Sequence, residues 1–420
     1  MISFNDKGNL LNEKIELPYT YNELNELITN KELPGSKDWT GWYDDLKSDN
    51  LDILDQLEVI KNFRSKAKVM VVIGIGGSYL GSKAIYEALK QDKDDYQLLF
   101  AGINLSSDYT QSLLDYCKDN DFVVCYITKS GTTLEPAISF RLFKDLLISK
   151  YGKDCLKDRC IIITGQNNQL REYALSKDIV TFDVPETTGG RYSVFSSVGL
   201  VPLSFLGIDV STFLKSAKQA IQDDLVNKDN SIAYRYACNR YEQYMSGNKV
   251  EAYVIYLPQL HYLLEWNKQL FGESEGKEGK GLLPISLSNT SDLHSLGQFV
   301  QDGSKILFET VIKVNNEKYQ INIPYDEDNF DNLNQYQKIE LSTINNYALE
   351  GTKNAHLAGG VSNLEFTLDK IDESSLGYFM ASMLLSCMYS GYFLKLNPFD
   401  QPGVEFYKKE IVKILNASDK

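Results

Sequence analysis

Short apolar runs alternate with amphipathic stretches along most of the chain. The runs are rich in β-branched and aromatic residues, which is typical of strands that are buried on both faces of a sheet. They lie at residues 69–73, 98–102, 122–127, 160–165, 179–184, 252–257 and 306–314. Segments with helical spacing of apolar residues, such as 51–64, precede and separate them. Strands that alternate with helices predict parallel sheets covered on both faces, so the pattern predicts a doubly wound α/β fold.

The same pattern divides the chain into two α/β units. We expect the first unit at residues 49–205 and the second at 246–396, joined by a helical connector at 206–245. A mostly helical arm, 1–48, is expected to pack on the main body. The turn-rich sequence NPFDQPG at 397–403 then precedes a final helix from Val404, and both belong to the C-terminal segment 397–420. A chain of this length is long enough for two units that each have their own core.

One uncharged helix needs a separate interpretation. Residues 376–394 carry no charge over a length close to that of a membrane span. Gly, Ser, Cys and Tyr dilute this segment, and a helix-capping sequence that begins at Asp372 precedes it. We therefore expect a helix buried inside an α/β protein, and no membrane partner.

Charge and cysteine usage narrow the possible partners. The chain of 420 residues has 43 Lys and Arg against 57 Asp and Glu, a formal net charge of −14, and no basic stripe. This balance argues against nucleic acid and anionic membranes as partners. Six cysteines lack CxxC spacing and three histidines form no HExxH motif, so we expect reduced cysteines and no metal site. With no signal-peptide pattern at the start, these features favour a cytoplasmic protein.

Two turns rich in glycine or hydroxyl groups follow strands of the first unit. Residues 128–133 read TKSGTT and lead into a helix at Glu135-Pro136. Unpaired N–H groups and the positive dipole end of a helix attract anions, so this turn predicts a phosphate site rather than an ordinary capped helix start. Residues 74–81 read GIGGSYLG, where Tyr79 replaces the third glycine of the dinucleotide fingerprint. We expect both turns to hold one anionic ligand.

Further motifs carry groups suited to proton transfer and to stabilising negative charge. Arg191 follows two glycines, which let a permanent positive charge approach a ligand closely. Glu273 and His294 supply a carboxylate and an imidazole, and Gln401 and Lys408 fall on one helical face. Taken singly, each motif has a plain alternative: a surface ion pair, a solvated acidic loop or a structural histidine.

Together these motifs resemble the glucose-6-phosphate isomerase (phosphoglucose isomerase) family in its bacterial form. The resemblance is carried by GGRYSVFSSVGL at 189–200, GESEGKEGKG at 272–281 and GYFLKLNPFDQPGVEFYKK at 391–409. It implies two sugar-isomerase (SIS) domains of flavodoxin-like topology, a homodimer, and no cofactor or metal. It also implies reversible aldose–ketose isomerisation of glucose 6-phosphate to fructose 6-phosphate, through ring opening and an enediolate, in glycolysis and gluconeogenesis.

The resemblance also assigns roles to individual residues. Glu273 would move a proton between C1 and C2 of the sugar, and Arg191 would stabilise the enediolate. His294 of the neighbouring subunit would open the ring with Lys408, and Gln401 would contact the substrate. The expected phosphate and sugar ligands are Gly77, Ser78, Thr128, Lys129, Ser130 and Thr133.

Some alternatives stay open at this point. A non-catalytic sugar-phosphate sensor would need the two turns, but not Glu273, His294 and Lys408 together. The isomerase half of an amidotransferase would need an N-terminal nucleophilic cysteine and a glutaminase domain, which this sequence lacks. Glu275 and Glu278 add negative charge close to Glu273 in the sequence and either raise its pKa or face solvent.

Overall fold

The computed structural model describes residues 2–11, 15–48, 51–90 and 95–418, and contains two five-stranded sheets. The first sheet is entirely parallel, with strand order β3-β2-β4-β5-β6. Its strands are β2 (Val69–Ile73), β3 (Gln97–Ala101), β4 (Phe122–Thr128), β5 (Cys160–Thr164) and β6 (Val180–Asp183). This order is that of flavodoxin-like sheets, whose winding direction reverses between β2 and β4. All five strands predicted for this unit are confirmed.

Helices connect and cover these strands. They are α6 (Leu80–Leu89), α7 (Ser107–Asp119), α8 (Leu134–Tyr151), α9 (Leu156–Arg159), α10 (Gln169–Ser176) and α11 (Ser197–Leu206). The helix predicted at 51–64 is divided into α4 (Ile53–Gln56) and α5 (Ile60–Arg64) by a 3-10 turn at Leu57–Val59. The predicted doubly wound architecture of the first unit is therefore present.

The second sheet repeats the same winding. Its strand order is β1-β10-β9-β7-β8, and the last four strands are parallel. They are β7 (Val250–Ile255), β8 (Leu283–Ser288), β9 (Leu307–Val314) and β10 (Asn363–Leu368), accompanied by α15 (Gly297–Asp302) and α16 (Leu341–Ala358). The sequence pattern predicted β7 and β9 but missed β8 and β10, because these two strands mix polar and apolar residues.

The N-terminal arm differs in part from its prediction. It contains the helices α1 (Tyr21–Thr29), α2 (Ser36–Trp39) and α3 (Gly41–Lys47), but begins with a strand, β1 (Ile2–Gly8). β1 pairs with β10 antiparallel and forms an edge of the second sheet. Ile2 and Phe4 are buried while Ser3 and Asn5 are exposed, a two-residue alternation that a strand produces.

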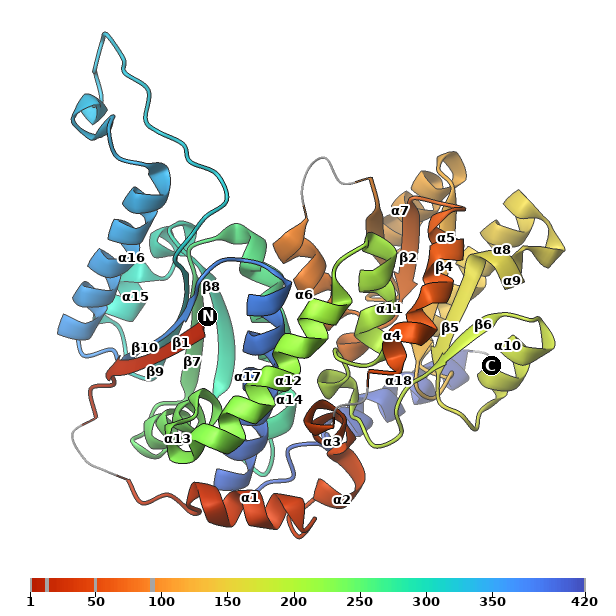
Figure 1. The fold of residues 1–420 in the computed structure, drawn as a ribbon, viewed down its shortest axis with the longest axis horizontal. Coiled ribbons are helices and arrows are strands. Elements are labelled where there is room, and N and C mark those ends of the chain that lie inside the picture. The colour runs from red at the N-terminus through yellow and green to blue at the C-terminus, as the bar shows by residue number, and fades with distance from the viewer. Residues whose placement is uncertain (1, 12–14, 49–50, 91–94, 419–420) are drawn as a thin grey trace.

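Helices between the two sheets join the units into one body (Figure 1). α17 (Glu373–Phe393) is buried along almost its whole length and packs on α12 (Val210–Asn227) and α13 (Ile232–Met245). α14 (His261–Glu275) packs on α6 of the first unit and on α17. The uncharged segment at 376–394 is therefore a core helix, and no helix among the described residues is long and apolar enough to cross a bilayer.

The last helix contrasts with α17. α18 (Val404–Ser418) starts at the residue expected from the NPFDQPG turn. Its side chains are exposed, including apolar ones such as Phe406 (75%) and Ile414 (64%). The rest of the described chain therefore leaves both faces of α18 largely uncovered.

Candidate active site

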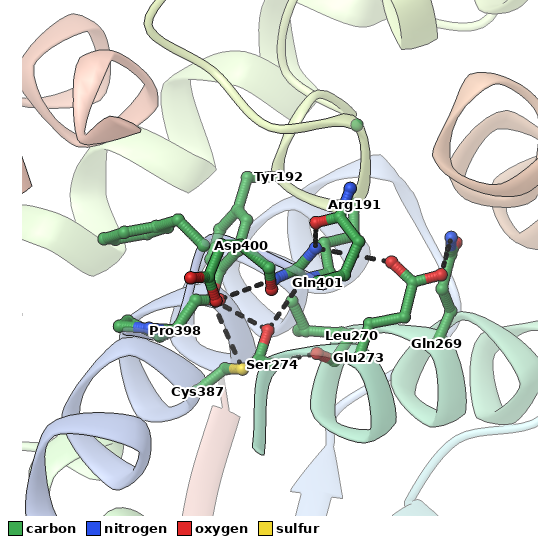
Figure 2. Close-up of polar contacts among 12 residues, drawn as sticks. Arg191, Tyr192, Gln269, Leu270, Glu273, Ser274, Cys387, Pro398, Asp400 and Gln401 are labelled. Atoms are coloured by element: carbon green, nitrogen blue, oxygen red, sulfur yellow. Dashed lines mark hydrogen bonds and ion pairs between the residues drawn. The ribbon is translucent and has the colours of Figure 1, made fainter. Parts of the chain in front are cut away.

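Arg191 gathers three segments that lie far apart in the sequence. It is 3% exposed and lies in a 3-10 turn, Gly190–Tyr192, after β6. Its Nη1 donates to Oε2 of Glu273 at 3.3 Å and to Oε1 of Gln401 at 2.8 Å. Its Nε donates to Oγ of Ser274 at 2.8 Å (Figure 2). Arg191, Glu273 and Gln401, which the sequence motifs singled out, therefore meet in one place.

The same guanidinium holds the NPFDQPG turn. Its Nη2 donates to the backbone carbonyls of Pro398 at 2.8 Å and Asp400 at 3.0 Å. Lys277 reinforces this turn, because its Nζ donates to the carbonyl of Asp400 at 2.7 Å and also reaches the carbonyl of Asn397. Burial lowers the pKa of Lys277. No role was predicted for this lysine, although it lies in the motif GESEGKEGKG at 272–281.

The carboxylate of Glu273 is held on both oxygens yet remains accessible. Oε2 contacts Arg191, and Oε1 accepts a hydrogen bond from Nε2 of Gln269 at 3.1 Å. The side chain of Glu273 is 35% exposed. Gln269 precedes Glu273 by one turn of α14, a spacing that places both on one helical face and could have revealed it from sequence. The carboxylate is thus oriented by two donors and can still reach a ligand.

The two glutamates next to Glu273 in the sequence have other partners. Glu275 is fully buried and turned into the core, where it pairs with Arg240. Burial raises the pKa of Glu275. Glu278 is 67% exposed and pairs with Lys280 at 3.3 Å. Glu278 therefore faces solvent, which is one of the two alternatives that the sequence left open. Glu275 instead belongs to a separate buried network.

The glycine-rich turn after β2 packs directly against the Arg191 turn. A Cβ atom on Gly77 would lie 2.0 Å from the carbonyl oxygen of Gly190 and 2.7 Å from the amide nitrogen of Arg191. Gly76 has a φ of +57°, and a Cβ there would meet Gln269 at 2.8 Å. Only glycine permits this approach without displacing backbone. Gly77 and Ser78, expected to bind substrate, therefore border the group around Glu273.

The second turn ends β4, beside the first. Thr128 accepts a hydrogen bond from the amide of Gly131 at 3.2 Å, and Ser130 accepts one from the amide of Thr132 at 3.2 Å. Thr133 is the N-cap of α8 but makes no side-chain capping bond, which leaves its hydroxyl available to a ligand. Because β2 and β4 flank the point where the winding reverses, both turns open onto the usual ligand crevice of such sheets.

Lys129, a predicted phosphate ligand, contacts backbone carbonyls and an aromatic ring in the structure. Its Nζ donates to the carbonyl of Glu186 at 2.7 Å and to that of Thr188 at 3.4 Å, and it lies 4.6 Å from the ring centre of Trp39. Burial lowers its pKa. In this arrangement Lys129 ties the phosphate turn to the loop that precedes Arg191.

His294 and Lys408 are not brought to this group within one chain. Lys408 is 50% exposed on α18 and pairs with Glu405 at 2.9 Å. His294 is exposed at the end of a 3-10 turn, Ser291–His294, that follows β8. Within the described residues, neither contacts Glu273 or Arg191. The role expected of Lys408 stays a prediction, because α18, which carries it, does not pack on this group in the structure.

The assembled group has a defined chemical capacity. It offers one accessible carboxylate beside a fixed guanidinium, and two turns with amide and hydroxyl donors border it. Such an arrangement suits proton transfer next to a developing negative charge on an anionic ligand. In the part of the chain that the structure describes, no cluster of three or more His, Cys, Asp or Glu could hold a metal ion.

The chain is similar in sequence and in fold to known proteins. The family model for phosphoglucose isomerase matches residues 60–324, more than half of the chain. Glucose-6-phosphate isomerase of Staphylococcus saprophyticus is 45% identical over 385 residues, covering 90% of this chain and 87% of that protein. The corresponding enzyme of Acholeplasma laidlawii is 44% identical over 399 residues, covering 94% of each chain. A solved glucose-6-phosphate isomerase of Chlamydia trachomatis has the same fold, with a TM-score of 0.76, 22% identity, and coverage of 87% of this chain and 73% of that one.

Proposed function

The chain belongs to the phosphoglucose isomerase family, and we propose that its reaction takes place at the residues that Arg191 gathers around Glu273. The reaction is the reversible aldose–ketose isomerisation of glucose 6-phosphate to fructose 6-phosphate, a step of glycolysis and gluconeogenesis. A sugar-phosphate sensor without activity is not favoured, because relatives that match 90% of the chain at 45% identity are named as the enzyme. One observation supports this location of the site: Nη1 of Arg191 contacts both Glu273 and Gln401.

Glu273 is the proposed base. The carboxylate takes the proton from C2 of the open-chain aldose, the C–H electron pair forms the C1–C2 double bond, and the carbonyl electron pair moves onto O1 to give the enediolate. A proton then passes from the O2 hydroxyl to O1, the O2 electron pair forms the C2 carbonyl, and return of the first proton from the carboxyl group to C1 gives the ketose. The accessible carboxylate, with both oxygens already held by donors, is oriented for such a transfer without further ordering.

Arg191 is the proposed stabiliser of the enediolate. Its guanidinium is fixed by contacts to Ser274, Pro398 and Asp400, so little reorganisation is needed when charge develops on the sugar oxygens. A preorganised positive charge in a partly buried site lowers the barrier more than a mobile one. Gln401, held by Nη1 of the same arginine, is positioned to contact the sugar beside it.

The two turns are the proposed phosphate and sugar ligands. Gly77 and Ser78 of one turn and Thr128, Ser130 and Thr133 of the other offer amide and hydroxyl donors at the edge of the first sheet. We expect Lys129 to act on the phosphate at longer range, since carbonyl groups hold its ammonium in the structure. The substrate phosphate thus anchors the sugar while Glu273 reacts.

Ring opening completes the proposal, with His294 supplied by a second copy of the chain and Lys408 as its partner. Exposed apolar side chains support a homodimer: Leu296 and Phe299, both close to His294, are 40% and 42% exposed. More of them lie on the long projection before α16, where Tyr325 is 65% and Phe330 82% exposed (Figure 1). A second copy that covers these groups would be stabilised by their burial.

We also propose that the protein works in the cytoplasm. All six cysteines are free, and five of them are buried among apolar residues. Such cysteines are typical of proteins in a reducing compartment, where the sugar phosphates of glycolysis are found.

Substitution of the proposed base tests the mechanism directly. Glu273→Gln keeps the shape of the side chain but removes its ability to accept a proton, so we expect kcat to fall by a factor of about 100 to 10,000. A coupled assay that converts glucose 6-phosphate onward measures this loss. Calorimetric titration with fructose 6-phosphate is expected to give a Kd within about threefold of the parent value. An undiminished kcat would refute the assignment of Glu273.

Mixing two inactive variants tests the shared site. His294→Ala and Glu273→Gln each lack one group of the same proposed site. If His294 serves the partner subunit, a refolded equal mixture regains up to about a quarter of the parent activity, because about half of the dimers are mixed and each of these contains one intact site out of two. The matched control mixes Glu273→Gln with Arg191→Ala, where both lost groups belong to one chain's site. Full activity of a monomer, measured by sedimentation with assay, would contradict the proposal.

A further inference from the structure

The side chain of Lys277 is bound to the turn that carries Gln401. Lys277 lies two residues after the end of α14, and its side chain is 9% exposed. Its Nζ donates to the backbone carbonyl of Asp400 at 2.7 Å and to the carboxylate of Asp400 at 2.5 Å, and it also contacts the carbonyl of Asn397. An ammonium group has three N–H donors, so each of them has an acceptor in this turn. Any effect of Lys277 on a substrate therefore passes through the turn.

The backbone carbonyl of Asp400 accepts from two cations. Nη2 of Arg191 donates to it at 3.0 Å, and Nζ of Lys277 donates to it at 2.7 Å. Gln401 is the next residue in the chain, and its Oε1 accepts from Nη1 of the same guanidinium at 2.8 Å (Figure 2). One backbone group thus connects the ammonium of Lys277 to both Arg191 and Gln401. A shift of this carbonyl would displace both groups.

The two cations have separate counter-charges. Lys277 pairs with the carboxylate of Asp400 at 2.5 Å, whereas Arg191 pairs with Glu273 at 3.3 Å. Burial lowers the pKa of Lys277, Asp400 opposes this shift, and the charge of Arg191 adds to it. Because Asp400 compensates the charge of Lys277, Glu273 stays the carboxylate partner of Arg191.

We propose that Lys277 is a positioning residue for the isomerisation. Its ammonium fixes the backbone of the NPFDQPG turn, and the carbonyl of Asp400 then sets where Arg191 and Gln401 lie relative to Glu273. This role rests on the proposed function, because it assigns Lys277 to the reaction of Glu273 and Arg191. A displacement of about 1 Å at a reacting centre lowers the rate by about 100-fold, so a buried anchor of this kind affects turnover without touching the substrate.

Lys277→Met tests the anchor, because methionine keeps an unbranched side chain but has no donor for the turn. We expect kcat to fall by about 10- to 100-fold. The KM for fructose 6-phosphate is expected to change by less than about threefold, because the two phosphate turns keep their donors. Calorimetric titration with fructose 6-phosphate counts the folded sites, so that kcat is expressed per site. A parent-like kcat per site, or a raised KM with kcat retained, would overturn the proposal.

A milder substitution covers the case in which the methionine variant does not fold. Lys277→Gln keeps an N–H donor but is shorter and uncharged, and we expect its kcat to be about threefold to tenfold lower than that of the parent. A parent-like kcat in this variant would also contradict the role of Lys277.

Lys280→Met is the matched control. Lys280 lies in the same motif, and its side chain is 36% exposed. It donates to the carbonyl of Leu394 at 3.2 Å and not to the NPFDQPG turn. We expect its kcat to stay within about twofold of the parent value. A loss of kcat equal to that of Lys277→Met would point to general disruption of the motif and refute a specific anchor.

A double-mutant cycle shows whether Lys277 acts through Arg191. It compares Arg191→Lys, Lys277→Met and the double variant with the parent. If the two residues act together, the loss of kcat in the double variant is at least about threefold smaller than the product of the single losses. Losses that multiply would make Lys277 independent of Arg191 and overturn the proposal.

The same cycle distinguishes two kinds of failure. A parent-like kcat in Arg191→Lys would contradict the proposed role of Arg191 and, with it, the role of Lys277. A large loss in Arg191→Lys beside a parent-like kcat in Lys277→Met would contradict the role of Lys277 alone and leave the proposed function in place.

Discussion

Two buried arginines hold the last turn of α14 from different sides, and they differ in what surrounds them. Arg191, 3% exposed, contacts Glu273 and Ser274, and the carboxylate of Glu273 is 35% exposed. Arg240 is fully buried and pairs with Glu251 and Glu275, which are equally buried. Residues two positions apart point about 200° apart on a helix, so Glu273 and Glu275 necessarily face different surroundings.

The contrast separates a chemical role from a structural one. Around Arg240, Glu251 is satisfied inside the protein: besides Arg240, it accepts from Thr310 at 2.7 Å and Tyr253 at 3.1 Å, and contacts Tyr236. No substrate can reach that network. Most hydrogen bonds that Arg191 donates go to neutral acceptors. Its one carboxylate partner, Glu273, remains partly exposed. The Arg240–Glu275 pair is therefore closed to a ligand, whereas the Arg191–Glu273 pair is open to one. The burial of the carboxylate distinguishes the two pairs.

Breaking the sealed network is expected to have the largest effect on stability. Arg240→Met leaves Glu251 and Glu275 buried without a cation, which should lower the free energy of unfolding by about 3–5 kcal/mol. Urea denaturation followed by circular dichroism measures the change. Arg235→Met is the control, because Arg235 pairs with Asp6 where both side chains are about one-third exposed, and a loss of about 1 kcal/mol or less is expected. Equal losses in the two variants would contradict the comparison.

Changing the reactive arginine is expected to affect turnover more than folding. Arg191→Lys keeps the charge, but one ammonium cannot replace the donors of a planar guanidinium. We expect kcat to fall by about 100-fold or more, with a loss of unfolding free energy of about 1–2 kcal/mol. Steady-state kinetics and urea denaturation on the same preparation measure both. A stability loss as large as that of Arg240→Met, with kcat retained, would reverse the roles assigned to the two arginines.

The smallest expected effect concerns the pH dependence of stability. Because burial raises the pKa of Glu275 above 4.5 in the folded state, folding favours its protonated form. The resulting stability is present below pH 4.5 and is lost as pH rises through the folded pKa. Glu275→Gln removes this titration, while Glu251 still neutralises Arg240. As pH rises above 4.5, we expect the unfolding free energy of the variant to fall less than that of the parent.

A charge-matched control completes that measurement. Glu278→Gln removes an exposed carboxylate from the same motif. Urea denaturation across the pH range should give this variant the slope of the parent. If Glu278→Gln changed the slope and Glu275→Gln did not, the burial argument for Glu275 would be wrong.

The sequence by itself determined the elements that are buried on both faces. A continuous apolar run is stable only in the interior, where both faces of the strand are removed from water. β2 was predicted at its observed bounds, Val69–Ile73, and α18 at its observed start. β8 and β10 were missed because their residues mix polarity, and β1 because its partner strand lies at the other end of the chain. Such pairings depend on contacts that no local pattern contains.

The candidate active site also has a part that the sequence predicted and a part that only the tertiary structure decided. Arg191, Glu273 and Gln401 stood out as unusual groups in short motifs, and the structure brings them together. Tertiary structure decided the rest: it turned Glu275 into the core towards Arg240, tied Lys129 to backbone carbonyls and left Lys408 on an exposed helix. A motif specifies which groups are available, but the packing of distant segments sets which charge each one meets and how much water remains around it.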